Sequence, residues 1–327
     1  MSVLVTGGAG YIGAHVVRLL QKDDVEVVVV DDLSSSEPER VGISPLIRLD
    51  ISTADAPAVL AQAMREHRVE SVIHFAAKKQ VGESVQRPLF YYRQNLGGLV
   101  NVLEAMEETG VRKMIYSSSA AVYGEPEEAI ILEDSRTSPI NPYGRTKLVG
   151  EWIMEDCERA WGLNWVALRY FNVAGSGWDD LGDPAIMNLI PMVLDRLERG
   201  ESPRVFGDDY PTPDGTCIRD YVHVKDLAAA HIAAMEALEG ELQHHVFNVG
   251  TGTGSSVREV IDAVGAASGL DTTPLVEERR PGDPPKLIAS SERIAEDMGF
   301  TAHLGLNEIA ESAWRAWQAG PRRIETS

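Results

Sequence analysis

Residues 3–13 read VLVTGGAGYIG, a short apolar run followed by a glycine-rich turn and the start of a helical pattern. Gly7, Gly10 and Gly13 form the spacing G-x-x-G-x-x-G, a variant of the dinucleotide fingerprint. Glycines allow a tight turn and a close approach of the backbone to a pyrophosphate, and the helix amino terminus presents free N–H groups to the phosphates. The stretch therefore predicts a dinucleotide site at the first strand–helix turn.

Asp31 closes the second predicted strand and lies 18 residues after Gly13, near the spacing of about 20 expected for a ribose-binding carboxylate. A carboxylate accepts hydrogen bonds from ribose hydroxyls and repels a 2′-phosphate, and no arginine stands at Leu33 or Ser34 to reverse this preference. The sequence therefore favours NAD over NADP as the cofactor. The alternative is that Asp31 only caps a turn.

Short apolar runs alternate with helical patterns up to about residue 170. We expect strands at 3–6, 25–30, 46–49, 71–75, 114–117, 165–169 and 246–249, and helices at 11–22, 54–66, 88–109, 143–160, 227–238 and 257–267. Because the early runs are almost continuously apolar, helices should cover both faces of a parallel sheet. The pattern predicts an α/β fold with a doubly wound, Rossmann-type sheet as the NAD-binding domain at 1–172, and a smaller, loop-rich substrate domain at 173–327 that is interleaved with it.

The composition excludes several classes of protein. Thirty Lys and Arg side chains stand against 50 Asp and Glu, a net charge of −20 that repels nucleic acid and anionic lipid. No apolar run approaches the roughly 20 residues of a membrane span, and the amino terminus has no basic region of a signal peptide. Cys157 and Cys217 form no cysteine framework, so we expect a cytoplasmic protein with two buried, reduced thiols.

Tyr143 and Lys147 are four residues apart on a predicted helix and so leave the same face. The helix follows a predicted strand that ends in Ser117-Ser118-Ser119, and the carboxyl ends of such strands form the ligand crevice. A tyrosine acts as a base only when its phenolate is stabilised, and a nearby ammonium and a positive nicotinamide both lower the phenol pKa. Tyr143, Lys147 and the serines therefore predict removal of an alcohol proton during hydride transfer. The alternative is that Tyr143 and Lys147 lie on a solvent-exposed helix face and have no catalytic role.

The sequence resembles the extended short-chain dehydrogenase/reductases and, among them, the family of UDP-glucose 4-epimerases. The resemblance rests on VLVTGGAGYIG (3–13), VIHFAA (72–77), VGESVQ (81–86), SSSAAVYG (117–124), NPYGRTK (141–147), RYFNVAG (169–175), FGDDYPTPDGTCIRDYVHVKDLA (206–228), FNVGTG (247–252) and RRPGD (279–283). The block at 206–228 is the most specific, because generic dehydrogenases have no counterpart to it. The motifs cover nearly the whole chain.

The resemblance implies a reaction and a set of site residues. Sugar C4 is oxidised by tightly bound NAD, the 4-keto intermediate rotates, and hydride returns to the opposite face, which interconverts UDP-galactose and UDP-glucose. The implied catalytic residues are Ser119, Tyr143 and Lys147. The implied cofactor contacts, besides the three glycines, are Tyr11, Ile12, Asp31, Asp32, Asp50, Ile51, Phe75, Ala76, Ala77, Lys79, Gln94, Asn95, Tyr143, Lys147 and Phe171. The implied UDP-sugar contacts are Ser119, Tyr143, Asn172, Asn188, Phe206, Arg219, Arg280, Asp283 and Leu287.

Three positions depart from the family pattern. Ala121 replaces a common threonine near the sugar, and Gln94 replaces a common asparagine near NAD, with Asn95 next to it. Leu287 stands where a tyrosine excludes an N-acetyl group and a small residue admits it. Leucine is intermediate in size, so epimerisation of UDP-GlcNAc and UDP-GalNAc, or of a UDP-pentose, stays open as an alternative. The family also implies a homodimer through the helices that begin at Pro88 and Tyr143.

Two rival functions on the same fold are disfavoured. A nucleotide-sugar 4,6-dehydratase needs an acid and a base beside Ser119, where this chain has Ala120 and Ala121. A non-catalytic NAD(P) sensor would have no need of serine, tyrosine and lysine together. Alternative interpretations of the arginines are an ion pair between Arg219 and Asp220 and a solvated charge at Arg280. We expect no metal site, and we expect His15, His74 and His223 to be structural.

Overall fold

The structure, a computed structural model of the chain, describes residues 1–280 and 283–320. Its large sheet contains β1 (Ser2–Thr6), β2 (Glu26–Asp31), β3 (Leu46–Arg48), β4 (Ser71–His74), β5 (Lys113–Ser117), β7 (Asn164–Tyr170) and β11 (Val246–Val249). The strand order is β11-β7-β5-β4-β1-β2-β3, and every neighbouring pair is parallel. This is the doubly wound parallel sheet that the sequence predicts, with its topological switch point between β1 and β4.

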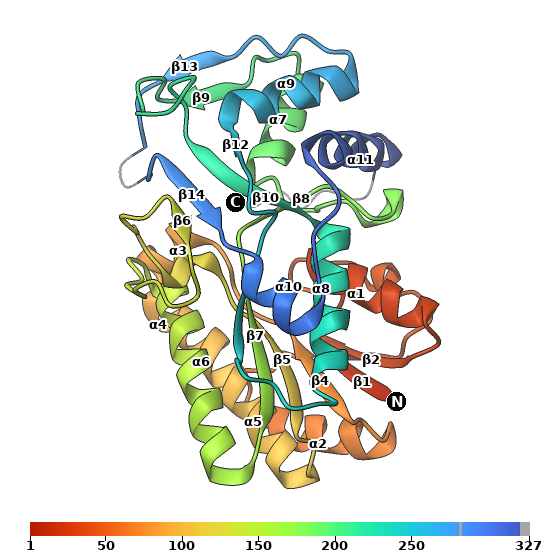
Figure 1. The fold of residues 1–327 in the computed structure, drawn as a ribbon. Coiled ribbons are helices and arrows are strands. Elements are labelled where there is room, and N and C mark those ends of the chain that lie inside the picture. The colour runs from red at the N-terminus through yellow and green to blue at the C-terminus, as the bar shows by residue number, and fades with distance from the viewer. Residues whose placement is uncertain (281–282, 321–327) are drawn as a thin grey trace.

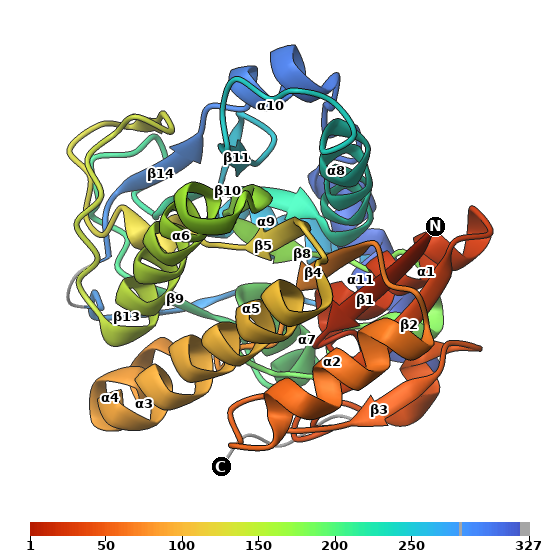
Figure 2. The same cartoon turned by 90° about the horizontal axis from the view of Figure 1, so that it is seen from below.

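Helices cover both faces of this sheet (Figures 1 and 2). On one face α1 (Tyr11–Lys22) packs against α8 (Val224–Ala237), and on the other lie α2 (Ala56–Glu66), α5 (Gly98–Thr109) and α6 (Pro142–Trp161). Successive side chains of β1 alternate between the two cores, Val3 and Val5 in one and Leu4 in the other, and all are fully buried. This two-sided burial explains the continuously apolar strands.

A second lobe lies at the upper end of the molecule in Figure 1. Its strands are β6 (Ile130–Ile131), β8 (Asn172–Ala174), β9 (Arg204–Phe206), β10 (Ile218–His223), β12 (Gly254–Ser256), β13 (Leu275–Glu277) and β14 (Lys286–Ala289), and its helices are α7 (Leu189–Glu198), α9 (Val257–Ser268) and α11 (Leu306–Ala319). The order β12-β10-β14-β6 forms a mixed sheet, and β8 also pairs with β10. The three helices pack around a core that includes Ile190, Val260 and Ile309.

The chain passes between the lobes more than once. Strand β7 of the large sheet leads directly into β8, which pairs with β10. After β10, the chain returns to the large sheet as α8 and β11, and β11 pairs with β7. Between the lobes, α10 (Glu292–Met298) packs against β11 and α8. The division of the chain at residue 172 stays a prediction.

The expected helical stretch 88–109 is present with its predicted bounds, but its interior is not regular α-helix. The segment 88–109 is not a single α-helix, because α4 (Pro88–Tyr91) passes into a π-helical turn, η2 (Tyr92–Gly97), before α5. A short helix, α3 (Val81–Gln86), precedes it, and single turns occur at η1 (Pro38–Val41), η3 (Ala120–Val122) and η4 (Asp179–Leu181). A π turn inserts one extra residue and so re-aims neighbouring side chains. Gln94 and Asn95 both lie in it.

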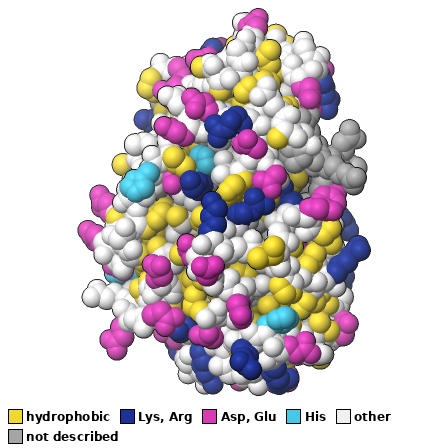
Figure 3. Space-filling model, turned by 90° about the vertical axis from the view of Figure 1, so that its right-hand side faces the viewer, with side chains coloured by type: hydrophobic (Ala, Val, Ile, Leu, Met, Phe, Trp, Pro, Cys, Tyr) yellow, Lys and Arg dark blue, Asp and Glu magenta, His cyan; other side chains and the backbone are white. Residues whose placement is uncertain are grey.

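The two cysteines differ in burial. Cys217 is buried as expected, but Cys157 is only half-buried, and both are free thiols. Among residues 1–280 and 283–320, no helix is both long and apolar enough to cross a membrane. On the face shown in Figure 3, lysine and arginine side chains gather near the middle and again at the lower end, and acidic side chains are spread between and around them.

Candidate active site

The glycine-rich turn joins β1 to α1 at the switch point of the sheet. Gly7 has a φ of +70°, and a Cβ there would lie 2.7 Å from the backbone nitrogen of Ala76, just after β4. A Cβ on Gly13 would collide with the carbonyl oxygen of Gly7. No side chain caps α1 at Gly10, and its first turn has no acidic residue. Close backbone packing therefore requires both glycines, and the start of α1 offers uncapped N–H groups to an anion such as a pyrophosphate.

Asp31 braces this turn from the end of β2. Its Oδ2 accepts a hydrogen bond from the backbone N–H of Ala9 at 3.0 Å, and its Oδ1 accepts one from Leu33 at 2.9 Å. Burial raises the pKa of Asp31, while these two hydrogen bonds lower it. The turn-capping contact weighed for Asp31 is present, and it places the carboxylate beside the glycine turn.

Arg40 is a buried cation beside the same turn, and sequence reasoning missed it. Its Nε donates to the carbonyl oxygen of Ala9 at 3.0 Å, and its two terminal nitrogens donate to the carbonyl oxygens of Leu181 and Gly182 at 3.2 Å. The guanidinium thus ties the cofactor turn to a segment of the chain some 140 residues later, with separations of 141 and 142 residues. All three of its nitrogens are engaged in contacts with backbone carbonyls.

The two lysines after β4 behave differently. Lys78 Nζ lies 3.2 Å from Asp32 Oδ2 and donates to Ser34, so it bridges the ends of β4 and β2. Lys79, the lysine that the resemblance selects, is exposed. Lys79 therefore has the freedom to approach an anionic ligand, whereas Lys78 is already paired with a carboxylate.

The two amide side chains of the π turn, Gln94 and Asn95, bond to different parts of the structure. Gln94 Nε2 donates to Asp50 Oδ2 at 3.2 Å, on the loop after β3. Asn95 is buried; its Oδ1 accepts from the backbone N–H of Lys78 at 2.8 Å and its Nδ2 donates to Thr146 Oγ1 at 3.0 Å. Asn95 thus links the loop after β4 to the helix that carries Tyr143, and Gln94 holds the loop after β3.

The other expected cofactor residues surround this end of the sheet. Tyr11 donates to the carbonyl oxygen of Gly175 at 2.5 Å, and the ring of Phe75 lies 4.7 Å from that of His231. Ile51 and Phe171 are buried, and Ile12, Ala76 and Ala77 are half-buried.

Helix α6 presents Tyr143 and Lys147 to the end of β5. Asn141 caps the helix by accepting a hydrogen bond from Gly144 N–H at 2.8 Å, which starts the helix just before Tyr143. Both side chains are buried, and Lys147 Nζ donates to the carbonyl oxygen of Ser117 at 2.7 Å. Lys147 Nζ also lies 5.9 Å from the centre of the Tyr143 ring. The structure therefore brings the two residues together as their spacing predicts.

The protonation of these groups follows from their burial. Burial raises the pKa of the Tyr143 phenol, and a hydrogen bond with Ser119 lowers it. Burial lowers the pKa of Lys147 to about 7, and the opposite charge of Glu151 works against that shift. A phenol in this setting needs positive charge nearby to ionise near neutral pH, which the lysine provides and a bound NAD⁺ would add.

A buried polar network behind Lys147 was not predicted. Glu151 accepts two hydrogen bonds from Arg169, at 2.9 and 2.6 Å, and one from Ser118 Oγ at 2.5 Å. Arg169 also donates to the hydroxyl of Tyr123 at 2.9 Å, and that hydroxyl donates to Asn248 Oδ1 at 2.7 Å. The position of Glu151, one turn beyond Lys147, was the one available signal in the sequence.

The expected UDP-sugar residues lie mainly in the second lobe. Arg219 donates to the carbonyl oxygens of Ile218 and Pro284, and its Nη2 lies 3.4 Å from Asp283 Oδ1. The alternative ion pair with Asp220 is wrong, because that carboxylate is fully buried and accepts backbone N–H bonds from Thr251, Gly252 and Ala289. The structure thus joins Arg219 to Asp283, both expected contacts.

Arg280 is exposed and also contacts an aromatic ring. Its guanidinium carbon lies 3.8 Å from the centre of the Phe206 ring, so two expected substrate residues meet in a cation–π contact. Its neighbours Pro281 and Gly282 lie outside the described residues. Asn172 and Asn188 are exposed, and Asn188 donates to Asp183 Oδ2 at 3.2 Å.

Leu287 connects the second lobe to the catalytic end of β5. It lies opposite Arg219 in the parallel β10–β14 register and packs, half-buried, against a core cluster that includes Ala120 and Phe171. Ala120 follows Ser119 directly in the chain. Leu287 therefore lies near the serine that would hold the reacting hydroxyl.

Three histidines that we expected to be structural are buried and hydrogen-bonded within the protein. His15, His74 and His223 are buried and hydrogen-bonded, to Tyr11, Thr6 and Ser312 respectively. Across the described part of the chain, no group of three or more His, Cys, Asp or Glu side chains could hold a metal ion.

Comparisons with known proteins were made for the sequence and for the structure. The model of the NAD dependent epimerase/dehydratase family matches residues 3–250. A UDP-glucose 4-epimerase of Azospirillum brasilense is 45% identical over 99% of this chain and 93% of its own length. The structure of a Brucella ovis UDP-glucose 4-epimerase in complex with NAD is 42% identical, with a TM-score of 0.91 and 98% of each chain covered. That of a Thermotoga maritima UDP-glucose 4-epimerase with UDP-glucose is 33% identical, with a TM-score of 0.86 over 97% of this chain and 99% of that one.

Proposed function

The chain belongs to the NAD dependent epimerase/dehydratase family, and from this premise we propose that it interconverts UDP-galactose and UDP-glucose with NAD that stays bound. The observation that carries the proposal is the convergence of Ser119, Tyr143 and Lys147 at the end of β5, in a fold whose first helix has an uncapped amino terminus after a glycine-rich turn. The family resemblance, the doubly wound fold and the NAD cofactor expected from the sequence are confirmed.

In this mechanism Tyr143 is the base. Its phenolate would remove the proton of the sugar 4-hydroxyl, and Ser119 Oγ, which lies beside the phenol and lowers its pKa, would hold the same sugar oxygen. The Lys147 ammonium, whose Nζ lies 5.9 Å from the centre of the Tyr143 ring, would stabilise the phenolate. Bound NAD⁺ supplies the hydride acceptor and an additional positive charge. After the 4-keto sugar has rotated in the site, the hydride would return to the opposite face of C4 and Tyr143 would return the proton to the C4 oxygen, so no net electrons or protons are gained or lost.

The cofactor would be held by residues of the large sheet. The uncapped amino terminus of α1 would bind the pyrophosphate, and Asp31, Asp50 and Lys79 would contact the remaining parts of NAD. Because Arg40 is fully engaged with backbone carbonyls, no free arginine of the turn is positioned to favour a 2′-phosphate.

The UDP-sugar would be held between the lobes. Arg219 and Arg280 would bind the diphosphate, since arginine offers a planar fork that matches phosphate oxygens. Phe206, Asn172, Asn188 and Asp283 complete the proposed contacts. Ala120 and Ala121 transfer no protons, which disfavours dehydration of the sugar.

The proposal is tested with purified protein whose NAD content is measured after denaturation. UDP-galactose is added without further cofactor, and UDP-glucose is followed by chromatography. We expect conversion in both directions. Absence of UDP-glucose from protein with NAD verified bound would overturn the proposal.

Leu287 supports a second candidate activity, the epimerisation of N-acetylated UDP-sugars. Its half-buried side chain is smaller than tyrosine and borders the cluster beside Ser119. The measurement is the ratio of UDP-GlcNAc to UDP-galactose turnover by the same preparation. Equal rates would mean that the position admits the acetamido group, and no UDP-GlcNAc turnover would restrict the enzyme to hexoses without it.

We also propose a cytoplasmic homodimer. Large apolar side chains are exposed on the helices after β4: Val85 at 60%, Leu89 at 76% and Val100 at 39%. Leu89 and Val100 lie in the helical segment that begins at Pro88, one of the two through which the family resemblance implies dimerisation, and burial against a second copy would remove the apolar surface from water. The free state of both thiols agrees with a reducing compartment. Light scattering of the purified protein gives the mass, and a monomer would contradict the dimer.

A further inference from the structure

Helix α6 meets the end of β5 at three successive turns. Tyr143, Lys147 and Glu151 follow one another at intervals of four residues, and all three are buried. Each reaches a different residue of the Ser117-Ser118-Ser119 segment. Lys147 Nζ donates to the carbonyl oxygen of Ser117, Glu151 accepts from Ser118 Oγ, and Tyr143 bonds to Ser119.

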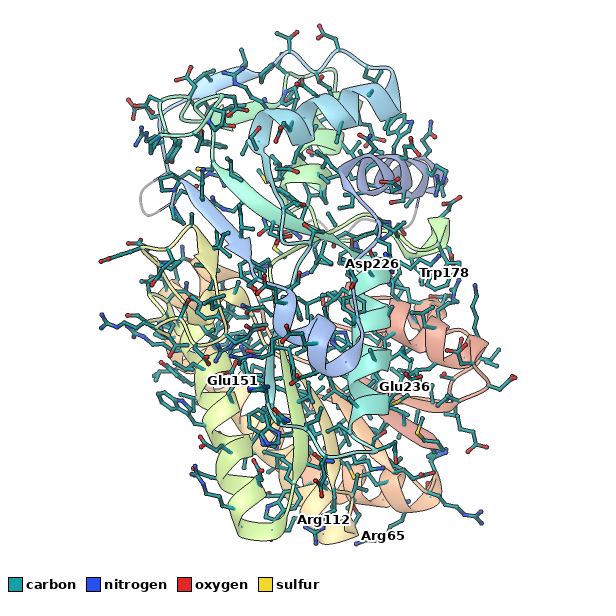
Figure 4. All side chains as sticks on the ribbon, in the orientation of Figure 1. Arg65, Arg112, Glu151, Trp178, Asp226 and Glu236 are labelled. Carbon is teal, nitrogen blue, oxygen red and sulfur yellow. The ribbon has the colours of Figure 1, made fainter. Side chains whose placement is uncertain are left out.

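Glu151 is held in place from a second direction as well. Figure 4 labels Glu151 on α6, and it is 4% exposed there. Arg169, on the neighbouring strand β7, donates its Nε to Oε1 at 2.9 Å and its Nη2 to Oε2 at 2.6 Å. Both carboxylate oxygens are therefore occupied, which fixes the side chain and its charge.

Arg169 extends this support to the segment that carries Ser119. Its Nη1 donates to the hydroxyl of Tyr123 at 2.9 Å and to the carbonyl oxygen of Glu133 at 3.1 Å. Tyr123 follows the short turn η3 that begins directly after Ser119. One buried arginine thus supports both the carboxylate behind Lys147 and the segment that carries the serine.

Lys147 needs a compensating negative charge because it is buried. The groups that face it are the ring of Tyr116 from β5 at 5.0 Å, the ring of Tyr143 at 5.9 Å, His74 from β4 and Glu151. Burial raises the pKa of Tyr116 far above its usual range and lowers that of His74 to about 3, so neither is charged near neutral pH. Glu151 is the carboxylate in this group.

We propose that Glu151, locked by Arg169 and Ser118, is a positioning residue that keeps the Lys147 ammonium charged beneath the catalytic tyrosine. The proposal rests on the proposed function for its consequence in turnover. Its structural alternative is that the Glu151–Arg169 pair only joins α6 to β7. The two roles predict different titrations of Lys147 when only the charge of Glu151 is removed.

Three variants separate these alternatives in the NAD-bound enzyme. Glu151→Gln removes the charge and keeps the shape, and Glu151→Asp keeps the charge. Glu155→Gln is the matched control on the next turn of α6, where the carboxylate forms a surface ion pair with Arg159 and is 48% exposed. The readouts are the pH profile of kcat with UDP-galactose and the NMR titration of lysine labelled with 13C at Cε, with Lys147 assigned through Lys147→Met.

In Glu151→Gln the Lys147 titration should move to lower pH by about one unit or more. The alkaline limb of kcat should move with it, so that activity above this limb falls about tenfold per unit, while KM changes less than about twofold. Glu151→Asp and Glu155→Gln should titrate like the wild type. An unshifted Lys147 titration in folded Glu151→Gln would overturn the proposal, even if turnover fell.

If Glu151→Gln does not fold, a double variant provides a second test. Removing both charges in Glu151→Gln/Arg169→Gln avoids an unpaired buried arginine, and the same downward shift of the Lys147 titration is expected. An unshifted titration in this variant would overturn the proposal too. Because the titration needs no substrate, its result stands apart from the proposed function, whose failure would be seen as absent UDP-galactose turnover by the wild type.

Discussion

The two sides of the proposed active site are built differently. On the large sheet, Tyr143 and Lys147 are buried and contact Ser119 and Ser117, respectively, at the end of β5. In the second lobe, Asn172, Asn188 and Arg280 are exposed. Chemistry at C4 needs one fixed geometry, whereas recognition of a nucleotide-sugar tolerates adjustment, so the rigid part is the one that carries the proton transfer. Substitutions in the first region should therefore reduce kcat and those in the second should raise KM.

Tyr143→Phe should have the largest effect on turnover. It removes the phenolic base and leaves the ring in place, so kcat with UDP-galactose should fall by at least about 10². The measurement is turnover of the purified variant, with NAD content and circular dichroism as controls for binding and folding. Near-normal turnover would remove Tyr143 as the base.

Gly13→Ala tests whether the cofactor turn is as closely packed as the structure indicates. A Cβ would meet the carbonyl oxygen of Gly7, and such overpacking costs about 1–3 kcal/mol. We expect the variant to lose most of its NAD on purification. The control is Gly82→Ala on α3, where a Cβ would meet nothing within 4 Å. Equal NAD content in both variants would contradict this account of the turn.

Arg219→Lys tests the second region. Lysine keeps the charge but loses the planar fork, so KM for UDP-galactose should rise about tenfold while kcat changes little. Arg204→Lys is a control in the same lobe, because Arg204 forms a surface pair with Glu277 and is 45% exposed. A fall in kcat without a rise in KM would mean that Arg219 acts in the chemical step and not in binding. That result would contradict the proposed difference between the two regions.

The smallest effect expected is a pH dependence of stability that comes from buried histidines. One of them, His223, lies on β10 of the second lobe, and burial lowers its pKa to about 4. Burial lowers the pKa of His15 and His74 to about 3 and that of His231 to about 4. In the unfolded chain these residues take up protons near pH 6.5. Their contribution to stability is therefore complete above about pH 6.5 and is lost progressively as the pH falls toward the folded-state values. The melting temperature should be lower at pH 5 than at pH 8, and His74→Gln should reduce the difference; an unchanged difference would contradict this origin.

The sequence predicted those parts of the molecule that depend on local patterns. The glycine turn and the Tyr143–Lys147 pair depend on spacings of three and four residues, and both are where the sequence placed them. The helix expected over 88–109 contains a π turn, in which the amides of Gln94 and Asn95 bond to Asp50 and Lys78, on loops that no local pattern reveals.

The network behind Lys147 was missed for a related reason. Glu151 and Arg169 are charged residues, and in a sequence such residues indicate solvent-exposed positions. Their burial depends on pairing between α6 and β7, whose residues are 18 apart in the chain. Arg40 was missed likewise, since its acceptors at Leu181 and Gly182 come from a distant segment. Long-range polar contacts of this kind become visible only in the folded structure.

The most direct test of the central claim is the fate of the hydrogen at sugar C4. UDP-galactose carrying deuterium at C4 is incubated with the NAD-bound protein in ordinary water, and the UDP-glucose formed is analysed by mass spectrometry. Transfer to bound cofactor and back predicts that the product keeps its deuterium, because Tyr143 exchanges only the hydroxyl proton. Replacement of the deuterium by solvent hydrogen would contradict an epimerisation by hydride transfer.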